Sequence, residues 1–399
     1  MNRSASLLVL LCLALLAGCS TTERESMVAD LLDQAREKFA PDRRTVVFDV
    51  EGRLRGRFLT LTGEVHDAQL KEQLFWFIKQ TGEFEIVDSV AVLPDSALGE
   101  KTFAVVSLSV ANLRQKRSHA AEMGTQATLG TPLKVLKKRR GWYYVQTPDE
   151  YLCWTTDMIQ LMNREEYRRW AARPKLIVTA PFGFTYASRN RSAQVVSDVV
   201  AGGLLALVGE AGRFYQVEYP DGRTAYLAKE EGEPFSAWLA RAEDTPESIV
   251  STAKTFMGVP YLWGGTSTKG MDCSGYTKTV YFLNGVLLPR DASQQARVGE
   301  LVETNEQMSQ VKPGDLVFFG SPATQERKER IWHVGISLGG TRFIHAAGDV
   351  RINSLAPADE DYSGPRARTF LRVKRIIGAG EKSGVRRLAQ VPYYRGNEE

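Results

Sequence analysis

The spacing of apolar residues predicts a chain built from several small modules. In residues 45–98, two strand-like runs precede residues 68–81, where apolar positions recur at the three- and four-residue spacing of a helix, and a third strand-like run follows. This alternation predicts a small α+β unit. Residues 243–378 form a last module, which opens with a helix capped at Thr245. Residues 379–399 are a polar tail to which we assign no structure.

Between these modules lies an internal repeat, with one copy in residues 101–170 and another in residues 174–235. Each copy alternates apolar and polar residues between Gly and Pro-Asp turns, which predicts a small β-barrel. Strand periodicity alone can produce chance matches, but seven landmarks recur about 72 residues later. They are Gly130, Gly141, Tyr143, Val145, Pro148, Asp149 and Trp154, matched by Gly202, Gly212, Tyr215, Val217, Pro220, Asp221 and Tyr226. We therefore expect a multidomain α+β protein.

Composition excludes some classes of partner. The chain has 43% apolar and 25% charged residues, as ordinary globular proteins do. The net charge of +4 is spread along the chain, and a short basic run such as residues 137–140 is typical of a solvated hairpin tip. We expect no nucleic-acid partner.

The N-terminus predicts export. Arg3 precedes an apolar run that is shorter than the ~20 residues needed to cross a bilayer, so residues 1–19 are interpreted as a signal peptide. Leu16-Ala17-Gly18-Cys19 resembles the bacterial lipobox, which implies that Cys19 is lipidated and anchors the chain to a membrane. Ser20 after the cysteine implies the outer membrane, facing the periplasm. Residues 20–44 would then be a polar tether, part of it helical. An ordinary signal peptide with a chance cysteine is the alternative.

Few cysteines remain for other roles. Cys12 leaves with the signal and Cys19 would carry lipid, so only Cys153 and Cys273 could pair, and no disulfide framework exists. Cys153, between Leu152 and Trp154, is interpreted as a buried residue of the first barrel.

Cys273 has the setting of a nucleophile. The apolar residues after it fit one helical face, so Cys273 lies at a helix N-terminus, where N–H groups and the helix dipole favour a thiolate; we expect a lowered pKa. His333 and His345 lie in two strand-like runs joined by a Gly-Gly turn, a spacing that suits adjacent antiparallel strands with both imidazoles on one side. A base oriented by a second polar group is the general form of a catalytic triad.

Two other interpretations of these residues stay open. Cys273 could be a buried structural cysteine, although Asp272 and Ser274 flank it. The two histidines could bind a metal, but no third ligand has the spacing of a zinc site, so we expect neither metal nor cofactor.

Four motifs in order resemble the NlpC/P60 cell-wall cysteine peptidases. They are Asp272-Cys273-Ser274-Gly275, Pro313-Gly314-Asp315-Leu316-Val317-Phe318-Phe319, His333-Val334-Gly335-Ile336 and Phe343-Ile344-His345-Ala346. The resemblance implies a papain-like α+β domain, with Cys273 as nucleophile, His333 as general base and then acid, and His345 orienting His333. One departure is the polar segment 321–330, which is longer than usual and is interpreted as a surface insertion.

The order of modules resembles a narrower group. Two bacterial SH3-like domains before an NlpC/P60 domain are similar to the γ-D-glutamyl-L-diamino-acid endopeptidases, which implies peptidoglycan stem peptides with a free N-terminal L-alanine as substrate. The α+β unit faintly resembles BON modules. The same resemblance implies a set of substrate-binding residues, namely Glu122 and Tyr151 in the first SH3-like domain and Tyr261, Asp272, Ser274 and Ser293 in the catalytic domain.

These residues also have simpler interpretations. Glu122 could be a solvated carboxylate, Tyr151 could be barrel core, and Arg290-Asp291 could be an ion pair at a helix start. For the whole chain, the alternatives are an inactive wall-binding lipoprotein scaffold, or an amidase or acyltransferase on the same fold. The sequence does not distinguish diaminopimelate from lysine as the preferred residue.

Overall fold

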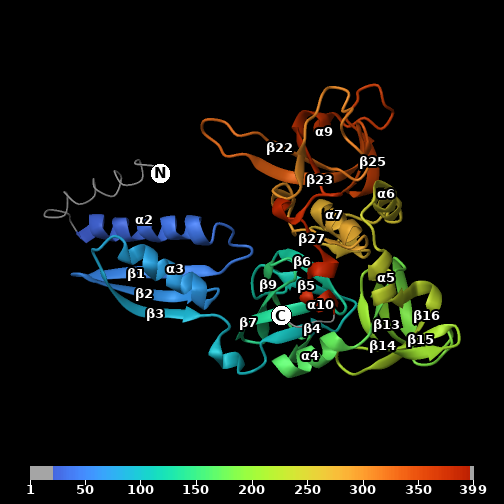
Figure 1. The fold of residues 1–399 in the computed structure, drawn as a ribbon, viewed down its shortest axis with the longest axis horizontal. Helices are drawn as coiled ribbons and strands as arrows, with labels where there is room; N and C mark the ends of the chain where they lie inside the picture. The colour runs from blue at the N-terminus through green and yellow to red at the C-terminus, as the bar shows by residue number, and fades with distance from the viewer. Residues whose placement is uncertain (1–20, 396–399) are drawn as a thin grey trace. The chain divides into compact units, whose positions relative to one another are not determined.

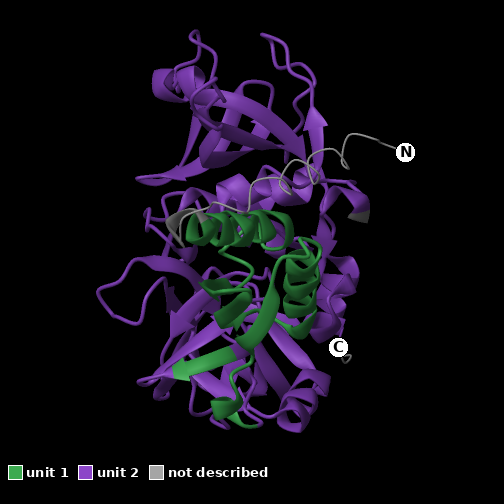
Figure 2. Cartoon of the chain, turned by 90° about the vertical axis from the view of Figure 1, so that its left-hand side faces the viewer, with its two compact units in different colours: residues 1–99, 136–138 green, residues 100–135, 139–399 purple. Residues whose placement is uncertain are grey.

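The computed structural model describes residues 21–395, which form two compact units. The first unit comprises the chain up to residue 99 with residues 136–138, and the second comprises the rest (Figure 2). The expected signal peptide and the lipobox cysteine, Cys19, lie outside the described residues. Within the described part of the chain, no helix combines the length and apolar character that a membrane span requires.

The first unit is a three-stranded sheet with two helices packed on it. The sheet order is β1-β2-β3, and β2 pairs antiparallel with β1 and parallel with β3, as the helical crossover through α3 requires (Figure 1). The elements are α2 (Thr21–Phe39), β1 (Phe48–Arg55), β2 (Phe58–Val65), α3 (Ala68–Lys79), β3 (Glu85–Val92) and the short 3-10 helix η2 (Ser96–Leu98).

The helices of this unit follow from local sequence. The Asp67 side chain caps α3 by accepting the N–H of Leu70 at 2.8 Å, and the predicted apolar face is buried. Helix α2 lies in the segment expected to be a partly helical tether. It buries Val28, Leu32 and Ala35 in the same core, so this part of the segment packs against the unit.

Two seven-stranded sheets follow, one in each copy of the repeat. The first contains β4 (Phe103–Val106), β5 (Val110–Arg114), β6 (Met123–Thr128), β7 (Pro132–Arg139), β8 (Trp142–Gln146), β9 (Leu152–Thr155) and β10 (Ile159–Met162). The second contains β11 (Lys175–Val178), β12 (Phe182–Tyr186), β13 (Val195–Val200), β14 (Leu204–Ala211), β15 (Phe214–Glu218), β16 (Thr224–Ala228) and β17 (Gly232–Pro234).

The two sheets share one topology. Their orders, β10-β4-β7-β8-β9-β5-β6 and β17-β11-β14-β15-β16-β12-β13, place corresponding strands in the same positions. Strands β11 to β15 occupy the ranges of β4 to β8 displaced by about 72 residues, the period of the repeat. Gly130 lies between β6 and β7, and Gly202 lies at the corresponding position between β13 and β14. Both have a positive φ, 77° and 82°, a conformation that favours glycine.

The last module, residues 243–378, packs helices against a six-stranded antiparallel sheet of order β21-β26-β22-β23-β24-β25. Its core gathers Tyr276 and Val280 of helix α7 with apolar residues of the central strands. The strands are β18 (Thr266–Ser267), β19 (Gly270–Met271), β20 (Val286–Leu287), β21 (Glu300–Val302), β22 (Leu316–Ser321), β23 (Arg330–Gly339), β24 (Arg342–Ala347), β25 (Asp349–Ser354) and β26 (Phe370–Arg375). The helices are α6 (Pro246–Lys254), α7 (Cys273–Phe282), α8 (Ala292–Gln295) and α9 (Gly364–Thr369).

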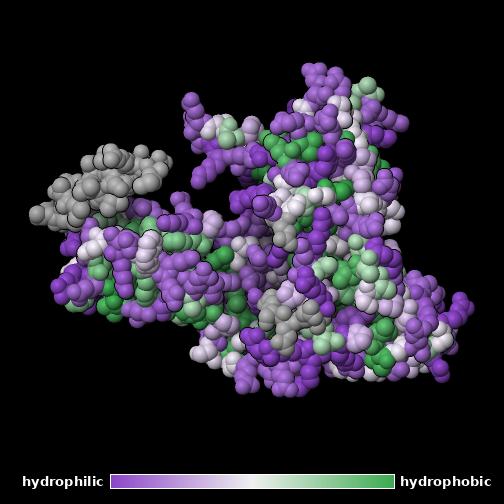
Figure 3. Space-filling view, in the orientation of Figure 1, coloured by the Kyte–Doolittle hydropathy of each residue, from purple (hydrophilic) through white to green (hydrophobic). Residues whose placement is uncertain are grey.

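The polar segment before His333 is the loop of the β22–β23 hairpin. Residues 322–330 are exposed, and the loop is coloured mainly as hydrophilic in Figure 3. It is therefore a surface segment, as its composition predicts.

The C-terminal polar tail forms short elements that pack against the other modules. Tyr393 and Tyr394 are buried, and the Tyr393 hydroxyl donates to the carbonyl of Gly130 at 2.7 Å while accepting from the indole of Trp170. No structure was assigned to this segment from the sequence, but its apolar residues are buried against residues of the other domains. The remaining elements are α4 (Arg164–Ala172), η3 (Lys229–Glu231), α5 (Phe235–Arg241), η4 (Glu381–Ser383), β27 (Arg386–Arg387), η5 (Leu388–Gln390) and α10 (Pro392–Arg395).

Candidate active site

Cys273 is the first residue of helix α7. The side chain of Asp272 caps the helix by accepting the N–H of Gly275 at 2.7 Å, which fixes the point where the helix begins. The thiol is nearly buried, with 6% of the residue exposed. Its sulfur lies 4.0 Å from the carbonyl oxygen of Trp332 and faces the N–H of Val334. Cys273 therefore meets strand β23 on both sides of His333.

The two histidines lie on neighbouring antiparallel strands and are hydrogen-bonded, as their spacing predicts. His333 Nε2 and His345 Nδ1 are 2.6 Å apart, with the rings nearly perpendicular. His345 Nε2 lies 2.9 Å from Oδ1 of Asn353 on β25, and Nδ2 of Asn353 donates to the carbonyl of Asp361 at 3.0 Å. We call these side chains, from His333 to Asn353, the histidine relay.

The end of the relay sets the tautomer of each imidazole. The carbonyl of Asp361 can only accept, so Nδ2 of Asn353 faces it and Oδ1 faces His345. Nε2 of His345 must then carry the proton, which leaves its Nδ1 as an acceptor. His333 consequently donates through Nε2, and its Nδ1 is left without a proton. A neutral imidazole in this tautomer is a base at Nδ1.

The charge state of the pair differs from the one expected. Burial raises the pKa of the Cys273 thiol to about 12, and the Asp272 carboxylate adds to the rise, although the N–H groups of Val334 and Ser274 oppose it. Burial, followed by the neighbouring His345, lowers the pKa of His333 well below its ordinary value. Burial also lowers the pKa of His345 to about 4. The expected lowering of the thiol pKa is therefore wrong: desolvation outweighs the helix N-terminus, and the resting thiol and imidazole are both neutral.

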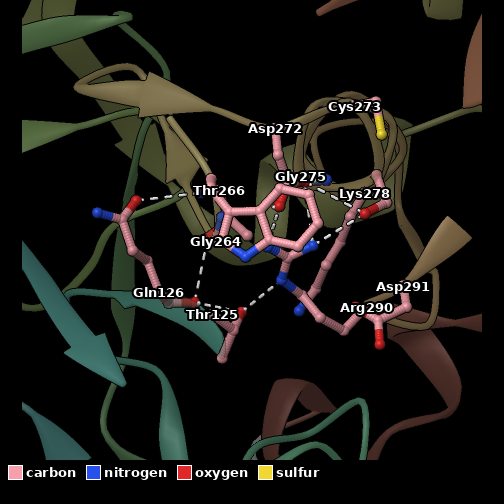
Figure 4. A network of polar contacts seen from close by, with 12 residues as sticks. Thr125, Gln126, Gly264, Thr266, Asp272, Cys273, Gly275, Lys278, Arg290 and Asp291 are labelled. Atoms are coloured by element: carbon pink, nitrogen blue, oxygen red, sulfur yellow. Dashed lines mark hydrogen bonds and ion pairs between the residues drawn. The ribbon is translucent and has the colours of Figure 1, made fainter. Parts of the chain in front are cut away.

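A buried ion pair holds the residue that caps the nucleophile's helix. Arg290 is 1% exposed, and its guanidinium binds the Asp272 carboxylate at 2.5 and 3.1 Å (Figure 4). The same guanidinium donates to Oγ of Ser274 at 2.9 Å and to Oγ1 of Thr125 at 2.9 Å. Because Thr125 belongs to the first SH3-like domain, this pair also joins that domain to the start of helix α7.

This network changes the interpretation of Asp272. Its carboxylate oxygens accept the N–H groups of Gly275 and Gly264, the guanidinium of Arg290 and the hydroxyl of Ser274. Asp272 and Ser274 are 6% and 5% exposed, so both are used within the protein. Cap and ion pair engage the Asp272 carboxylate, and its direct contact with the substrate stays a prediction. Arg290 pairs with Asp272 and not with its neighbour Asp291.

The first SH3-like domain brings two further predicted residues to the catalytic domain. Glu122 is exposed, and its Oε1 accepts the indole N–H of Trp263 at 2.7 Å. Tyr151 is 3% exposed, and its hydroxyl donates to Oδ2 of Asp291 at 3.1 Å. Each residue therefore hydrogen-bonds a catalytic-domain side chain, while the exposure of Glu122 and the burial of Tyr151 also agree with their simpler interpretations.

The last two predicted residues lie on segments beside the nucleophile. The N–H of Tyr261 donates to the carbonyl of Gly348 at 2.8 Å, which holds this residue against the end of strand β24. Burial raises the pKa of Tyr261, and Cys273 adds to the rise, so its phenol is a neutral donor. Ser293 is half-buried on helix α8.

Three residues of the site escaped sequence reasoning as functional positions: Asn353, Trp263 and Asp291. The available signal for Asn353 was its place in a strand-like run shortly after His345, which puts it on the neighbouring strand. Nothing in the local sequence shows that Trp263 meets Glu122, because the contact joins residues 141 positions apart. Among the residues described, no three His, Cys, Asp or Glu side chains gather as a metal site, and Cys153 and Cys273 are free thiols.

Comparison with known proteins agrees with this geometry. Residues 258–372 match the NlpC/P60 family, and residues 113–156 match the bacterial dipeptidyl-peptidase Sh3 domain. A γ-D-glutamyl-L-lysine dipeptidyl-peptidase of Bacillus cereus is 30% identical over 265 residues, covering 62% of this chain and 76% of that protein. The protein of the same name from Bacillus subtilis is 29% identical over 230 residues, covering 56% and 71%.

A solved structure is similar over the same region. The crystal structure of an NlpC/P60 family protein from Bacillus cereus covers 68% of this chain and 99% of its own, with a TM-score of 0.59 and 24% identity, and so supports the fold. The nucleophile-bearing helix, the paired histidine strands and these matches lead to one conclusion. The chain belongs to the NlpC/P60 family and is a cysteine peptidase.

Proposed function

We propose that the protein hydrolyses the γ-D-glutamyl–L-diamino acid bond of peptidoglycan stem peptides that have a free N-terminal L-alanine. The observation that carries this proposal is that Glu122 of the first SH3-like domain hydrogen-bonds Trp263 of the domain that holds Cys273 and the histidine relay. The names of the relatives support the same bond, since both are γ-D-glutamyl-L-lysine dipeptidyl-peptidases.

Acylation begins with a proton transfer. Nδ1 of His333 takes the thiol proton as Sγ of Cys273 forms a bond to the γ-carbonyl carbon of D-glutamate. The carbonyl π electrons move to oxygen, and the Tyr261 hydroxyl donates to that oxyanion. The C–N bond then breaks, and His333 returns its proton to the leaving amine of the diamino acid. The neutral resting pair makes the proton transfer part of the attack.

Deacylation repeats the same steps with water. His333 Nδ1 accepts a proton from water as its oxygen adds to the thioester carbonyl, and the C–S bond breaks as the thiol is reprotonated. The products are L-Ala-D-Glu, with a free γ-carboxyl group, and the diamino acid. His345 and Asn353 touch neither substrate nor nucleophile; they hold His333 in its basic tautomer.

The amine end of the substrate lies toward the first SH3-like domain. Glu122 supplies a carboxylate for the L-alanine ammonium, and Trp263 holds it through the indole N–H. Tyr151 and Asp291 form a second polar pair in this region, from the loop and the helix start that the two domains contribute. Ser293 lines the cleft from helix α8. An N-blocked peptide lacks the charge that Glu122 binds.

The proposal places the enzyme in the cell envelope. Export and lipidation at Cys19 would anchor it to the outer membrane, facing the periplasm, where stem peptides occur. This part rests on the N-terminal sequence alone.

Mass analysis of the products of L-Ala-γ-D-Glu-diaminopimelate tests the reaction. The expected products are the dipeptide L-Ala-D-Glu and free diaminopimelate, whose combined mass exceeds that of the tripeptide by one water. Release of free alanine, transfer of the acyl group to an added amine in place of hydrolysis, or an intact tripeptide after prolonged incubation would contradict the proposal.

A further inference from the structure

Arg366 is a cation near the nucleophile, and it has no carboxylate partner among residues 21–395. It lies on the short helix α9, which precedes strand β26, and it is half-buried. Its guanidinium carbon is 5.6 Å from the centroid of the Phe319 ring, and that ring is 5.6 Å from the ring of His333. Arg366 therefore lies on the histidine side of the site.

Electrostatic effects place the same guanidinium near the reacting groups. Burial is the main influence on the pKa of Arg366 and lowers it, while Cys273 and Tyr261 act in the opposite direction. After burial, Arg366 contributes to the lowered pKa values of both His333 and His345. Because Coulomb interactions weaken with distance, these effects agree with the ring contacts in placing Arg366 near the reacting groups.

Four arginines of the neighbouring sheet form ion pairs, and Arg330, for which the structure shows none, is exposed, so Arg366 differs in being both partly buried and without an ion pair. Arg342 binds Asp361 at 2.7 Å, and Arg375 binds Asp315 at 2.7 Å. Among the described residues, the Arg366 guanidinium has neither a carboxylate nor a hydrogen-bond partner. A partly desolvated guanidinium of this kind is destabilising unless an anion meets it. The missing anion is one that the protein does not supply.

We infer that Arg366 binds a carboxylate of the substrate next to the scissile bond, and so makes that negative charge a condition of efficient cleavage. The inference rests on the proposed function and adds a specificity-determining residue to it. A bond through the γ-carboxyl group leaves the α-carboxylate of D-glutamate free. The diamino acid carries its own carboxylate on the carbon attached to the leaving nitrogen. Both are carboxylates, and both lie a few bonds from the carbonyl that Cys273 attacks.

Three matched peptides identify the carboxylate. The reference is L-Ala-γ-D-Glu-L-Lys with both carboxylates free; one variant has the α-carboxyl of D-glutamate as a carboxamide, and the other has the C-terminal lysine carboxamide. We expect the full-length wild-type enzyme to lose about 10- to 100-fold in kcat/KM on one of the two amides, as for loss of a charge-assisted hydrogen bond. The peptide amide that is cleaved more slowly identifies the carboxylate that Arg366 binds.

The substitution Arg366→Gln tests whether Arg366 is the residue that binds this carboxylate. This variant should cleave the reference peptide as slowly as the wild type cleaves the discriminating amide, and should no longer distinguish the two. Arg368→Gln is the matched control, since Arg368 is an exposed arginine on the same helix and its loss removes the same charge. It should keep the wild-type preference. Arg366→Lys should retain part of it, because lysine keeps the charge but lacks the bidentate geometry.

Three outcomes would overturn the inference. One is a wild-type enzyme that cleaves all three peptides equally well, a result that needs no variant to fold. Another is an Arg366→Gln enzyme that slows equally on all three, which would assign the arginine to the charge of the thiolate instead of the substrate. The third is the same loss of preference in Arg368→Gln. Failure of the wild type to cleave any of the three would instead contradict the proposed function.

Discussion

The two SH3-like domains have one topology and different relations to the active site. Their strands follow the same order, and strands β6 and β13 occupy ranges displaced by the period of the repeat. The first domain contributes Glu122, Thr125 and Tyr151, whose side chains hydrogen-bond residues of the catalytic domain. At the positions that match Glu122 and Tyr151, the second domain has Gln194 and Arg223.

The contacts of the second domain are of a different kind. Lys269 of the catalytic domain pairs with Asp198 at 2.5 Å, and both side chains are partly exposed. Thr268 donates to the carbonyl of Pro181 at 2.6 Å, a contact that any residue at that position could accept. The fold therefore supplies a scaffold in both copies, while a few side chains on the loops and edges of one copy make it part of the site.

The largest effect should come from the ion pair that joins the first domain to helix α7. Arg290→Met leaves the Asp272 carboxylate buried without its partner, and we expect a loss of about 3–5 kcal/mol in the free energy of unfolding. Lys269→Met breaks the partly exposed pair with Asp198 and should cost at most about 1 kcal/mol. Chemical denaturation of both variants measures the difference. Equal losses would show that the two domains are held to the catalytic domain by similar contacts.

The second effect concerns the substrate amine. Glu122→Gln keeps the shape of the side chain and removes its charge, so kcat/KM on a free-amine tripeptide should fall about 10- to 100-fold. Activity on the N-acetylated tripeptide should not change. Glu210→Gln, an exposed glutamate of the second domain, is the control and should behave as wild type. An equal fall on free and blocked peptides would contradict the role of Glu122.

The smallest effect is a pH dependence that is weaker than an ordinary histidine would give. The His333 pKa is well below its usual value, so the base stays neutral as the pH falls through 6.5. We expect kcat/KM to change by less than about twofold between pH 7 and 6, whereas an imidazole with a pKa of about 6.5 would lose more than half its basic form over that range. An acid limb with an apparent pKa at or above 6.5 would contradict the neutral buried pair.

The free energy of unfolding should also depend on pH, and the dependence should differ between the domains. A histidine whose folded-state pKa is below its unfolded value favours the unfolded state as the pH falls below about 6.5. Loss of stability should begin there and continue toward pH 4, where His345 titrates in the folded protein. The second SH3-like domain contains no histidine, so this loss should come from the catalytic domain.

Local patterns predict the strands, the capped helices and the histidine pair well. Helix α3 follows its apolar spacing, and β23 and β24 follow the two runs around a Gly-Gly turn. The repeat is visible because Gly and Pro-Asp turns impose the same backbone at both copies. These features depend on residues within one or two elements, which a single sequence displays.

What the sequence did not reveal depends on distant partners. Nothing near Asp272 in the sequence shows that Arg290 binds its carboxylate. The helix start alone predicts a lowered pKa for Cys273, but burial raises it. Tyr393 and Tyr394 lie in a basic segment, and only contact with the other domains buries them. Tertiary contacts and desolvation decide each case, and neither can be inferred from local periodicity.

The central claim is that Cys273 is the nucleophile, and a matched pair of cysteine variants tests it most directly. Both cysteines of the described chain are buried free thiols, and alanine is tolerated sterically at either position. Turnover of L-Ala-γ-D-Glu-L-Lys should fall by about 10⁴-fold or more in Cys273→Ala. Cys153→Ala should keep wild-type kcat within about threefold, since only its packing changes. Substantial turnover by a folded Cys273→Ala protein would contradict the account.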